Sequence, residues 1–185
     1  YKVVGLTGWK RMAALKPLMR EFVPAQIAAE PESVSVIDTN FLEGCEGGCY
    51  LGGEEGLVAV ATHPDVDTVI AGVSGAAGLQ STLAAVEAGK RVLIANKEPL
   101  VMCGQLVRNA ASVSGACLMP IDSEHNAIFQ CLPLNLQQDV TSGRGIGSRS
   151  AGAGVSRITL TASGGPFLRT SAAAISDATP AQALA

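Results

Sequence analysis

The sequence has no uninterrupted apolar run approaching the ~20 residues that a membrane-spanning helix needs, and no basic segment followed by an apolar one opens it. Positive and negative charges are also nearly balanced, with 13 Lys and Arg against 16 Asp and Glu. The formal net charge is -3, and no stripe of Lys and Arg alternates with aromatic residues. These absences argue against a transmembrane segment and against a nucleic-acid-binding surface. We therefore expect a soluble protein whose partner is a small molecule.

Aromatic residues are also scarce, at 4% of the chain, although 48% of the residues are hydrophobic. Small and aliphatic side chains must therefore build the core. This is typical of α/β folds, where such residues let helices pack closely on parallel strands. The 185 residues suffice for one good core, or for one domain and the start of another.

The five cysteines are an odd number and lie scattered along the chain, which fits a reducing interior better than a disulfide framework. Cys45 and Cys49 form the only close pair. No Cys or His near them in the sequence supplies the further ligands that a closed zinc site needs. We interpret this pair as loop thiols.

Apolar periodicity alternates between strand and helix along most of the chain. Strands are expected at residues 1–6, 26–29, 68–73, 91–95, 116–119 and 157–161. Helices are expected at residues 11–22, 57–62, 79–87 and 104–114, and glycine-rich loops at residues 45–56 and 142–154. The alternation predicts a doubly wound α/β fold, in which ligands lie beyond the carboxyl ends of the strands. Because the first residue is Tyr and residues 1–6 read as a strand already in progress, we expect the natural N-terminus to be missing.

Asn96, Lys97 and Glu98 follow directly after the buried strand expected at residues 91–95. A cation and a carboxylate are thus delivered together to the edge of the sheet where α/β proteins bind ligands. Lys97 could hold a phosphate or a hydroxyl, Asn96 could both donate and accept, and Glu98 could accept from a ribose or an amide. A solvated loop with a capping Asn is an equally good interpretation of this segment taken alone.

Asp122 and Glu124 form a second candidate site, because two carboxylates two residues apart follow an apolar run. Mg²⁺ and Mn²⁺ prefer oxygen ligands, and a pair of carboxylates leaves room for a chelating substrate. Alternatively, Asp122 and Ser123 cap a helix over residues 124–132, where Glu124 in the first turn is favourable by ~0.3–1 kcal/mol. Both interpretations can hold at once. His125 is expected to pack or to support a ligand, since a hard metal prefers oxygen.

Residues 161–167 (TASGGPF) form a third candidate site, whose consecutive backbone N–H groups and hydroxyls could bind an anion. A generic β-turn is the alternative. Residues 142–154 are interpreted as a linker rather than a phosphate loop, because no strand leads in and no helix pattern leads out. The three sites together predict an enzyme that uses a divalent cation and an anionic small substrate. They do not show whether the reaction includes an oxidation or reduction.

Taken together, the motifs resemble the 1-deoxy-D-xylulose 5-phosphate reductoisomerase family over nearly the whole chain. Uncommon strings occur in the family's order: VVGL, EFVP, GEEGL, GAAGL, LAAVEAGKRVLIANKE, MPIDSEHNAIFQCLP and ITLTASGGPF. The combination of ANKE, DSEHNAIFQ and SGGPF makes the match specific. The resemblance implies a Rossmann-like NADPH-binding domain over residues 1–117, truncated at its N-terminus. It also implies that residues 118–185 begin an α+β catalytic domain that is truncated at its C-terminus.

The resemblance further implies an activity: the NADPH- and metal-dependent isomerisation and reduction of 1-deoxy-D-xylulose 5-phosphate to 2-C-methyl-D-erythritol 4-phosphate in non-mevalonate isoprenoid biosynthesis. The implied cation is Mn²⁺ or Mg²⁺, with Co²⁺ as a further candidate. The implied roles are NADPH contacts for Lys10, Asn96 and Glu98, metal ligation for Asp122 and Glu124, substrate contacts for Lys97, Ser123, Glu124 and Ser163, and catalysis for Lys97 and Glu124.

The chain departs from the family pattern in several places. The family's first strand and its GxTGSIG loop are absent, and the third metal carboxylate would lie beyond Ala185. Trp9 and Arg11 are unusual neighbours for Lys10, and Pro99 replaces the usual Ser. We therefore expect the full-length parent to be the enzyme and this segment alone to have little activity. The alternatives are an inactive relic, or another Rossmann-type reductase that needs no metal. The parent is expected to be a homodimer, in the bacterial cytoplasm or in a plastid or apicoplast.

Overall fold

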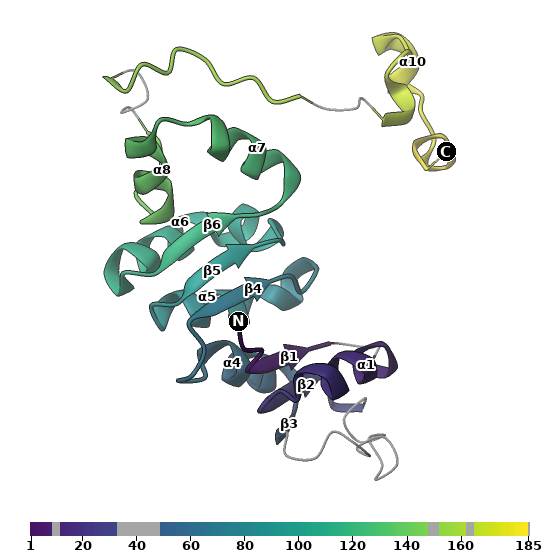
Figure 1. Cartoon of the computed structure of the whole chain (residues 1–185). Helices are drawn as coiled ribbons and strands as arrows, with labels where there is room; N and C mark the ends of the chain where they lie inside the picture. The colour runs from purple at the N-terminus through teal and green to yellow at the C-terminus, as the bar shows by residue number, and fades with distance from the viewer. Residues whose placement is uncertain (9–11, 33–48, 148–151, 162–164, 185) are drawn as a thin grey trace. The chain divides into compact units, whose positions relative to one another are not determined.

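The computed structural model describes residues 1–8, 12–32, 49–147, 152–161 and 165–184. The chain divides into two compact units, Tyr1–Val155 and Ser156–Ala185 (Figure 1). The first unit carries all the strands of the described residues, in two parallel three-stranded sheets. The predicted α/β fold is therefore confirmed. The expected functional boundary between residues 117 and 118 remains a prediction.

The first sheet has the strand order β1-β2-β3 and consists of β1 (Gly5–Thr7), β2 (Gln26–Ala29) and β3 (Cys49–Gly52). Helix α1 (Met12–Phe22) crosses from β1 to β2, and its Met19 packs with Ile27 and Ala29. Ala28 faces the other way and packs with Leu57 of α4 (Gly53–Thr62). Because neighbouring strand residues point to opposite faces, the sheet is covered by a helix on each face.

The second sheet has the strand order β4-β5-β6 and consists of β4 (Thr68–Ala71), β5 (Arg91–Ile94) and β6 (Cys117–Pro120). Between β4 and β5 come the 3₁₀ turn η1 (Gly75–Gly78) and helix α5 (Leu79–Glu87), and α6 (Glu98–Ser114) joins β5 to β6. The main core forms here, where Val86 and Val107 of the two helices pack on Val92 and Leu118 of the strands. The crossover helices thus hold three parallel strands in register.

Each sheet has two edge strands, and each of them pairs with a single strand among the described residues. In the second sheet the edge strands are β4 and β6, which both pair with β5. Ile70 on β4 is 69% exposed. An apolar strand edge with unpaired backbone groups is a surface that tends to pair with another chain.

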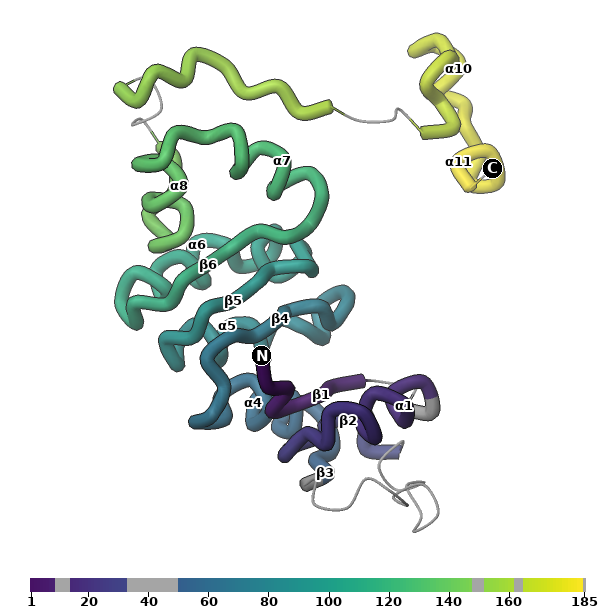
Figure 2. Tube along the Cα trace, viewed as in Figure 1, coloured from purple at the N-terminus to yellow at the C-terminus, as the bar shows by residue number. Residues whose placement is uncertain are grey.

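After β6 the chain continues into α7 (Ser123–Cys131) and α8 (Leu134–Thr141), as the trace in Figure 2 shows. Arg108 of α6 holds the turn that follows α8: its guanidinium donates to the carbonyls of Gly143 at 3.0 Å and of Arg144 at 3.1 Å. Arg144 in turn donates to the Asp139 carboxylate at 2.9 Å. These contacts fix the place where the chain leaves α8.

The second unit contains the short helices η2 (Gly165–Phe167), α10 (Ala172–Ser176) and α11 (Pro180–Ala183). The strand predicted at residues 157–161 is wrong, because these residues form no regular secondary structure. A strand is stable only when its backbone groups pair with a neighbour, and the described part of this unit contains no other strand. The β-branched residues of this segment favour a strand locally, but local preference alone does not form one.

One further expectation is corrected by the structure, and one is extended. The loop predicted at residues 45–56 is wrong from Cys49 onward, because β3 and the first turn of α4 lie there. Glycine permits this tight change from strand to helix at Gly53, whose φ is +70°. The helix predicted at residues 104–114 is confirmed. A shorter helical stretch that was not predicted precedes it from Glu98, with Pro99 in its first turn, and the two meet at a kink at Cys103, whose φ is -136° and ψ 29°.

Candidate functional site

The carboxyl ends of β5 and β6 bring the two candidate sites of the sequence together. Ile94 of β5 is paired in register with Pro120 of β6, so the residues that follow both strands leave the same edge of the sheet. Lys97 comes three residues after Ile94, and Asp122 and Glu124 come shortly after Pro120. The predicted position of these side chains, just after the carboxyl ends of two parallel strands, is confirmed.

Lys97 and Glu124 form an ion pair across this edge. Lys97 Nζ lies 3.3 Å from Glu124 Oε2, and the two side chains are about half exposed. Hydrogen bonding of the Glu124 carboxylate to its own backbone N–H is the largest cause that holds the pKa of Glu124 below its usual value of 4.5, and Lys97 lowers that pKa further. Glu124 is therefore ionised at neutral pH, in the form that a cation or a substrate hydroxyl would meet.

Asp122 is the N-cap of α7, as one of the two sequence interpretations predicted. Its Oδ2 accepts from the backbone N–H of His125 at 3.3 Å and lies 2.7 Å from His125 Nδ1. Its Oδ1 is buried and has no hydrogen-bond partner within the described residues. A buried carboxylate oxygen without a partner is costly unless a ligand or an ion completes it.

This orphaned oxygen fits a divalent cation. Asp122 Oδ1 and the Glu124 carboxylate are hard oxygen donors of the kind that Mg²⁺ and Mn²⁺ prefer. Nowhere in the described ranges do three or more His, Cys, Asp or Glu side chains gather as a complete metal site. Asp122 and Glu124 are therefore two candidate carboxylate ligands, and the described residues offer no third beside them.

Asn96 lies buried at the end of β5, with 7% of its surface exposed. Its amide nitrogen donates to the carbonyls of Val73 at 2.6 Å and of Gly75 at 3.0 Å, and its oxygen accepts from the Glu98 N–H at 3.3 Å. The sequence suggested a capping Asn or a ligand contact here. The geometry shows a residue that ties the loop after β4 to the start of α6.

The other predicted site residues fall into two groups. Glu98 and Ser123 are exposed in the first turns of α6 and α7, at the same edge as Lys97. Lys10 and Ser163 lie outside the described residues. Sequence reasoning did not single out Asn126, whose side chain donates to the Pro120 carbonyl at 2.8 Å and so anchors α7 to the end of β6. Its place one turn after the N-cap was the signal available.

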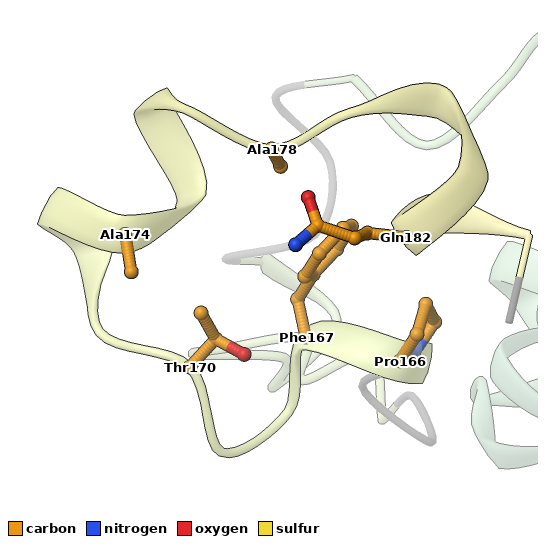
Figure 3. Close-up of a pocket in the computed structure, with 6 residues that line it drawn as sticks. All are labelled: Pro166, Phe167, Thr170, Ala174, Ala178 and Gln182. Carbon is orange, nitrogen blue, oxygen red and sulfur yellow. The ribbon is translucent and has the colours of Figure 1, made fainter.

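The second unit has an open pocket of about 510 Å³ between its short helices (Figure 3). The pocket is lined by Pro166, Phe167, Thr170, Ala174, Ala178 and Gln182. Gln182 takes part in a capping box with Thr179, in which its side-chain oxygen accepts from the Thr179 backbone N–H at 2.8 Å. None of the lining side chains is charged, so the pocket shows no sign of recognising a phosphate.

Two family models match the chain. The model for 1-deoxy-D-xylulose 5-phosphate reductoisomerase matches residues 1–104, and the model for the C-terminal domain of the same enzyme matches residues 118–185. Among curated proteins, the 1-deoxy-D-xylulose 5-phosphate reductoisomerase of Pseudomonas syringae is 50% identical over 187 residues and that of Stutzerimonas stutzeri 49%. Both alignments cover 100% of this chain but only 44% of the relative. The chain thus spans less than half the length of the curated relatives it matches.

Solved structures give the same result for the fold. A crystal structure of DOX-P reductoisomerase with NADPH, fosmidomycin and magnesium superposes with a TM-score of 0.86 at 44% identity, covering 100% of this chain and 44% of the other. The Zymomonas mobilis enzyme in complex with NADPH superposes with a TM-score of 0.78 at 34% identity, covering 98% of this chain and 44% of the other. At these values the likeness extends beyond the general α/β architecture.

Proposed function

The chain belongs to the 1-deoxy-D-xylulose 5-phosphate reductoisomerase family, and from this premise we propose that the protein carrying it converts 1-deoxy-D-xylulose 5-phosphate to 2-C-methyl-D-erythritol 4-phosphate. The proposed reaction rearranges the carbon skeleton of the substrate and then reduces the resulting aldehyde with NADPH, in the presence of Mn²⁺ or Mg²⁺, with Co²⁺ as a further candidate. It belongs to non-mevalonate isoprenoid biosynthesis.

The observation that carries the proposal is the meeting of Lys97, Asp122 and Glu124 at one edge of the sheet. Asp122 Oδ1 is buried and has no hydrogen-bond partner in the described part of the chain, and the pKa of Glu124 is lowered, so both carboxylates can accept a cation. A bound divalent cation would act as a Lewis acid on substrate oxygens that gain negative charge. Lys97 and Ser123 are exposed beside these carboxylates, where they can bind the hydroxyls or the phosphate of the sugar.

The cofactor is proposed to lie along the carboxyl ends of β4 and β5. This is the position at which doubly wound sheets bind dinucleotides. Glu98 is exposed there, and Asn96 shapes the loop beside it. A relative of known structure was crystallised with NADPH and magnesium together, which supports this pair of ligands for the family. Contacts of NADPH with Lys10, and of the substrate with Ser163, belong to the same proposal.

The chain alone is proposed to have little activity. It provides two carboxylates for the cation and spans 44% of the length of its relatives, so the remaining ligands have to come from elsewhere in the parent. The parent is proposed to act as a homodimer, in the cytoplasm if bacterial and in a plastid or apicoplast if eukaryotic. No helix among the described residues is long and apolar enough to cross a membrane.

The direct test is NADPH consumption by the full-length parent with 1-deoxy-D-xylulose 5-phosphate, with and without Mn²⁺. The same assay on Asp122→Asn separates the metal from the fold, because Asn keeps the N-cap acceptor but loses the charge. Turnover that needs Mn²⁺ and is lost in the variant is expected. A folded parent without turnover would overturn the proposal and favour an inactive relic, and turnover that ignores Mn²⁺ would favour another Rossmann-type reductase.

A further inference from the structure

Asn96 uses nearly all of its hydrogen-bonding capacity inside the protein. A neutral Asn side chain has two N–H donors and one oxygen acceptor. Its nitrogen is within 3.0 Å of two carbonyls, those of Val73 and Gly75, and its oxygen accepts from Glu98 N–H. No donor therefore remains on this side chain for a cofactor or a substrate in the structure as it stands.

The backbone beside Asn96 strengthens the same connection. The carbonyl of Ala71, at the end of β4, accepts from the N–H groups of both Ala95 and Asn96, at 3.1 and 2.9 Å. The loop after β4 and the turn after β5 are thus held together by backbone and side chain at once. Such a network fixes one arrangement of the turn after β5 against the loop after β4 and its 3₁₀ turn η1.

Gly78 supplies independent evidence that this close packing matters. A Cβ at this position would lie 2.4 Å from the Val73 carbonyl oxygen and 3.1 Å from Asn96 Nδ2. The φ of Gly78 is -81°, which other residues adopt readily, so the constraint is space and not backbone conformation. The turn at residues 75–78 is closed so tightly on the Val73 carbonyl, which Asn96 holds, that a side chain at Gly78 would displace it.

We propose that Asn96 is a positioning residue, which fixes the 73–78 loop against the first turn of α6 and so sets where Lys97 and Glu98 stand. The proposal rests on the proposed function and deepens it. Asn96 acts on cofactor and substrate through its neighbours, rather than by donating a hydrogen bond to a ligand. Lys97 and Glu98 follow it directly in the chain, so any rotation of the Asn96 turn moves both of them.

The test measures backbone amide hydrogen exchange in two variants of the chain. They distinguish the donor group of the Asn96 side chain from its acceptor oxygen. Asn96→Asp keeps an oxygen for the Glu98 N–H but removes the donors to Val73 and Gly75. Asn96→Ala removes both. We expect exchange in the 73–79 segment to rise about tenfold in both variants, since a broken buried hydrogen bond opens the structure locally. The Glu98 amide should exchange faster only in Asn96→Ala.

Matched controls show whether the change is local. Asn109→Asp makes the same chemical change at an exposed position on α6, where the side chain only accepts from Gln105. Gly104→Ala adds a methyl where nothing lies within 4 Å, whereas Gly78→Ala forces the loop away from Asn96 without altering that residue. Gly78→Ala should reproduce the faster exchange at residues 73–79, and the two controls should not. Amides of β5 serve as the internal reference for global unfolding.

A functional readout in the full-length enzyme completes the test. The KM for NADPH is expected to rise about tenfold in Asn96→Asp and Gly78→Ala, with kcat at saturating NADPH changed less than about threefold. The positioning role would be overturned if amide exchange at residues 73–79 were unchanged in Asn96→Asp and Asn96→Ala. It would also be overturned if the exchange rates of the β5 amides rose by the same factor. Local loosening in an enzyme that shows no turnover at all would leave the positioning role standing and refute the proposed function instead.

Discussion

Lys97 Nζ lies 3.3 Å from Glu124 Oε2, so a residue that follows β5 and a residue of α7 neutralise each other at the edge of the sheet. The pair joins the predicted substrate lysine to a predicted metal ligand. A cation that binds Glu124 must compete with Lys97 for the same carboxylate. After the backbone hydrogen bond of Glu124, Lys97 is the next cause that lowers the pKa of this carboxylate, and it also partly neutralises the charge that a cation would meet.

The first prediction concerns the pKa of Glu124 in Lys97→Ala. The pKa should rise, because Lys97 lowers it by hydrogen bonding and by charge, yet stay below 4.5, because the backbone hydrogen bond is the larger cause and remains. A carboxyl whose folded pKa is lowered stabilises the fold above its ordinary pKa, and this contribution is lost as the pH falls through the folded value. NMR titration of the side-chain carboxyl carbon measures the shift. Lys2→Ala removes a remote, exposed cation and should leave the Glu124 titration unchanged; equal curves for Lys97→Ala and the unaltered chain would contradict the assignment.

The second prediction separates the two roles of Asp122. Asp122→Asn should leave the stability of the chain nearly unchanged, whereas Asp122→Ala should cost about 1 kcal/mol through loss of the N-cap. Both should weaken Mn²⁺ binding by at least about tenfold, since even residues that only orient a ligand contribute that much. Urea unfolding gives the stabilities, and Mn²⁺ titration followed by electron paramagnetic resonance gives the affinities. Unaltered Mn²⁺ binding by Asp122→Asn would remove Asp122 from the ligand set.

The third prediction compares two glycines with the same backbone conformation. Gly143 and Gly115 have φ values of +77° and +76°. A Cβ at Gly143 would lie 2.5 Å from the Arg108 carbonyl oxygen, whereas nothing lies within 4 Å at Gly115. Gly115→Ala should cost about 1–2 kcal/mol from the left-handed conformation alone. Gly143→Ala should cost roughly 1–3 kcal/mol more because of the overlap. Urea denaturation midpoints measure both stabilities. Equal losses of stability in the two variants would contradict the prediction, because they would show that the turn after α8 moves to accommodate the added methyl group.

The fourth prediction concerns the open edge of β4. Ile70→Lys should reduce self-association of the chain at high concentration, because a charge on an exposed strand edge opposes pairing with a second copy. Stability should change by less than about 0.5 kcal/mol, as at other exposed sites. Val113→Lys introduces the same charge at a 91% exposed position on helix α6, which is not part of a strand, and should not alter association. Sedimentation velocity distinguishes the two, and equal behaviour of both variants would contradict an edge-driven association.

The sequence predicted most of the first unit because its signals are local. The helix expected at residues 79–87 and the strand expected at residues 26–29 have the observed bounds. Continuous apolar runs located β4, β5 and β6, as is typical of parallel sheets. The burial expected on both faces does not hold for β4, since its Ile70 is 69% exposed. Errors occurred where an element depends on distant partners. Strand β3 is held by β2, and residues 157–161 have no strand to pair with among the described residues.

The sequence selected the residues of the candidate site but did not show the contacts between them. Residue type and position after a strand were enough to select Lys97, Asp122 and Glu124. The sequence could not show that Lys97 pairs with Glu124, because 27 positions separate them and only the β5–β6 register brings them together. The sequence also could not decide whether Asn96 caps a helix or contacts a ligand, because the hydrogen-bond partners of Asn96, Val73 and Gly75, follow a different strand.

The pairing of β5 with β6 also constrains how this protein could have been assembled from parts. One family model ends at residue 104 and the other begins at residue 118, so the boundary between them falls inside α6 and its connection to β6. Yet β6 is the strand that completes the second sheet, and its pairing places Glu124 against Lys97. A recombination breakpoint at that boundary would exchange an edge strand together with half of the ion pair. Chimeras between relatives should therefore tolerate crossovers after α8 far better than crossovers within α6.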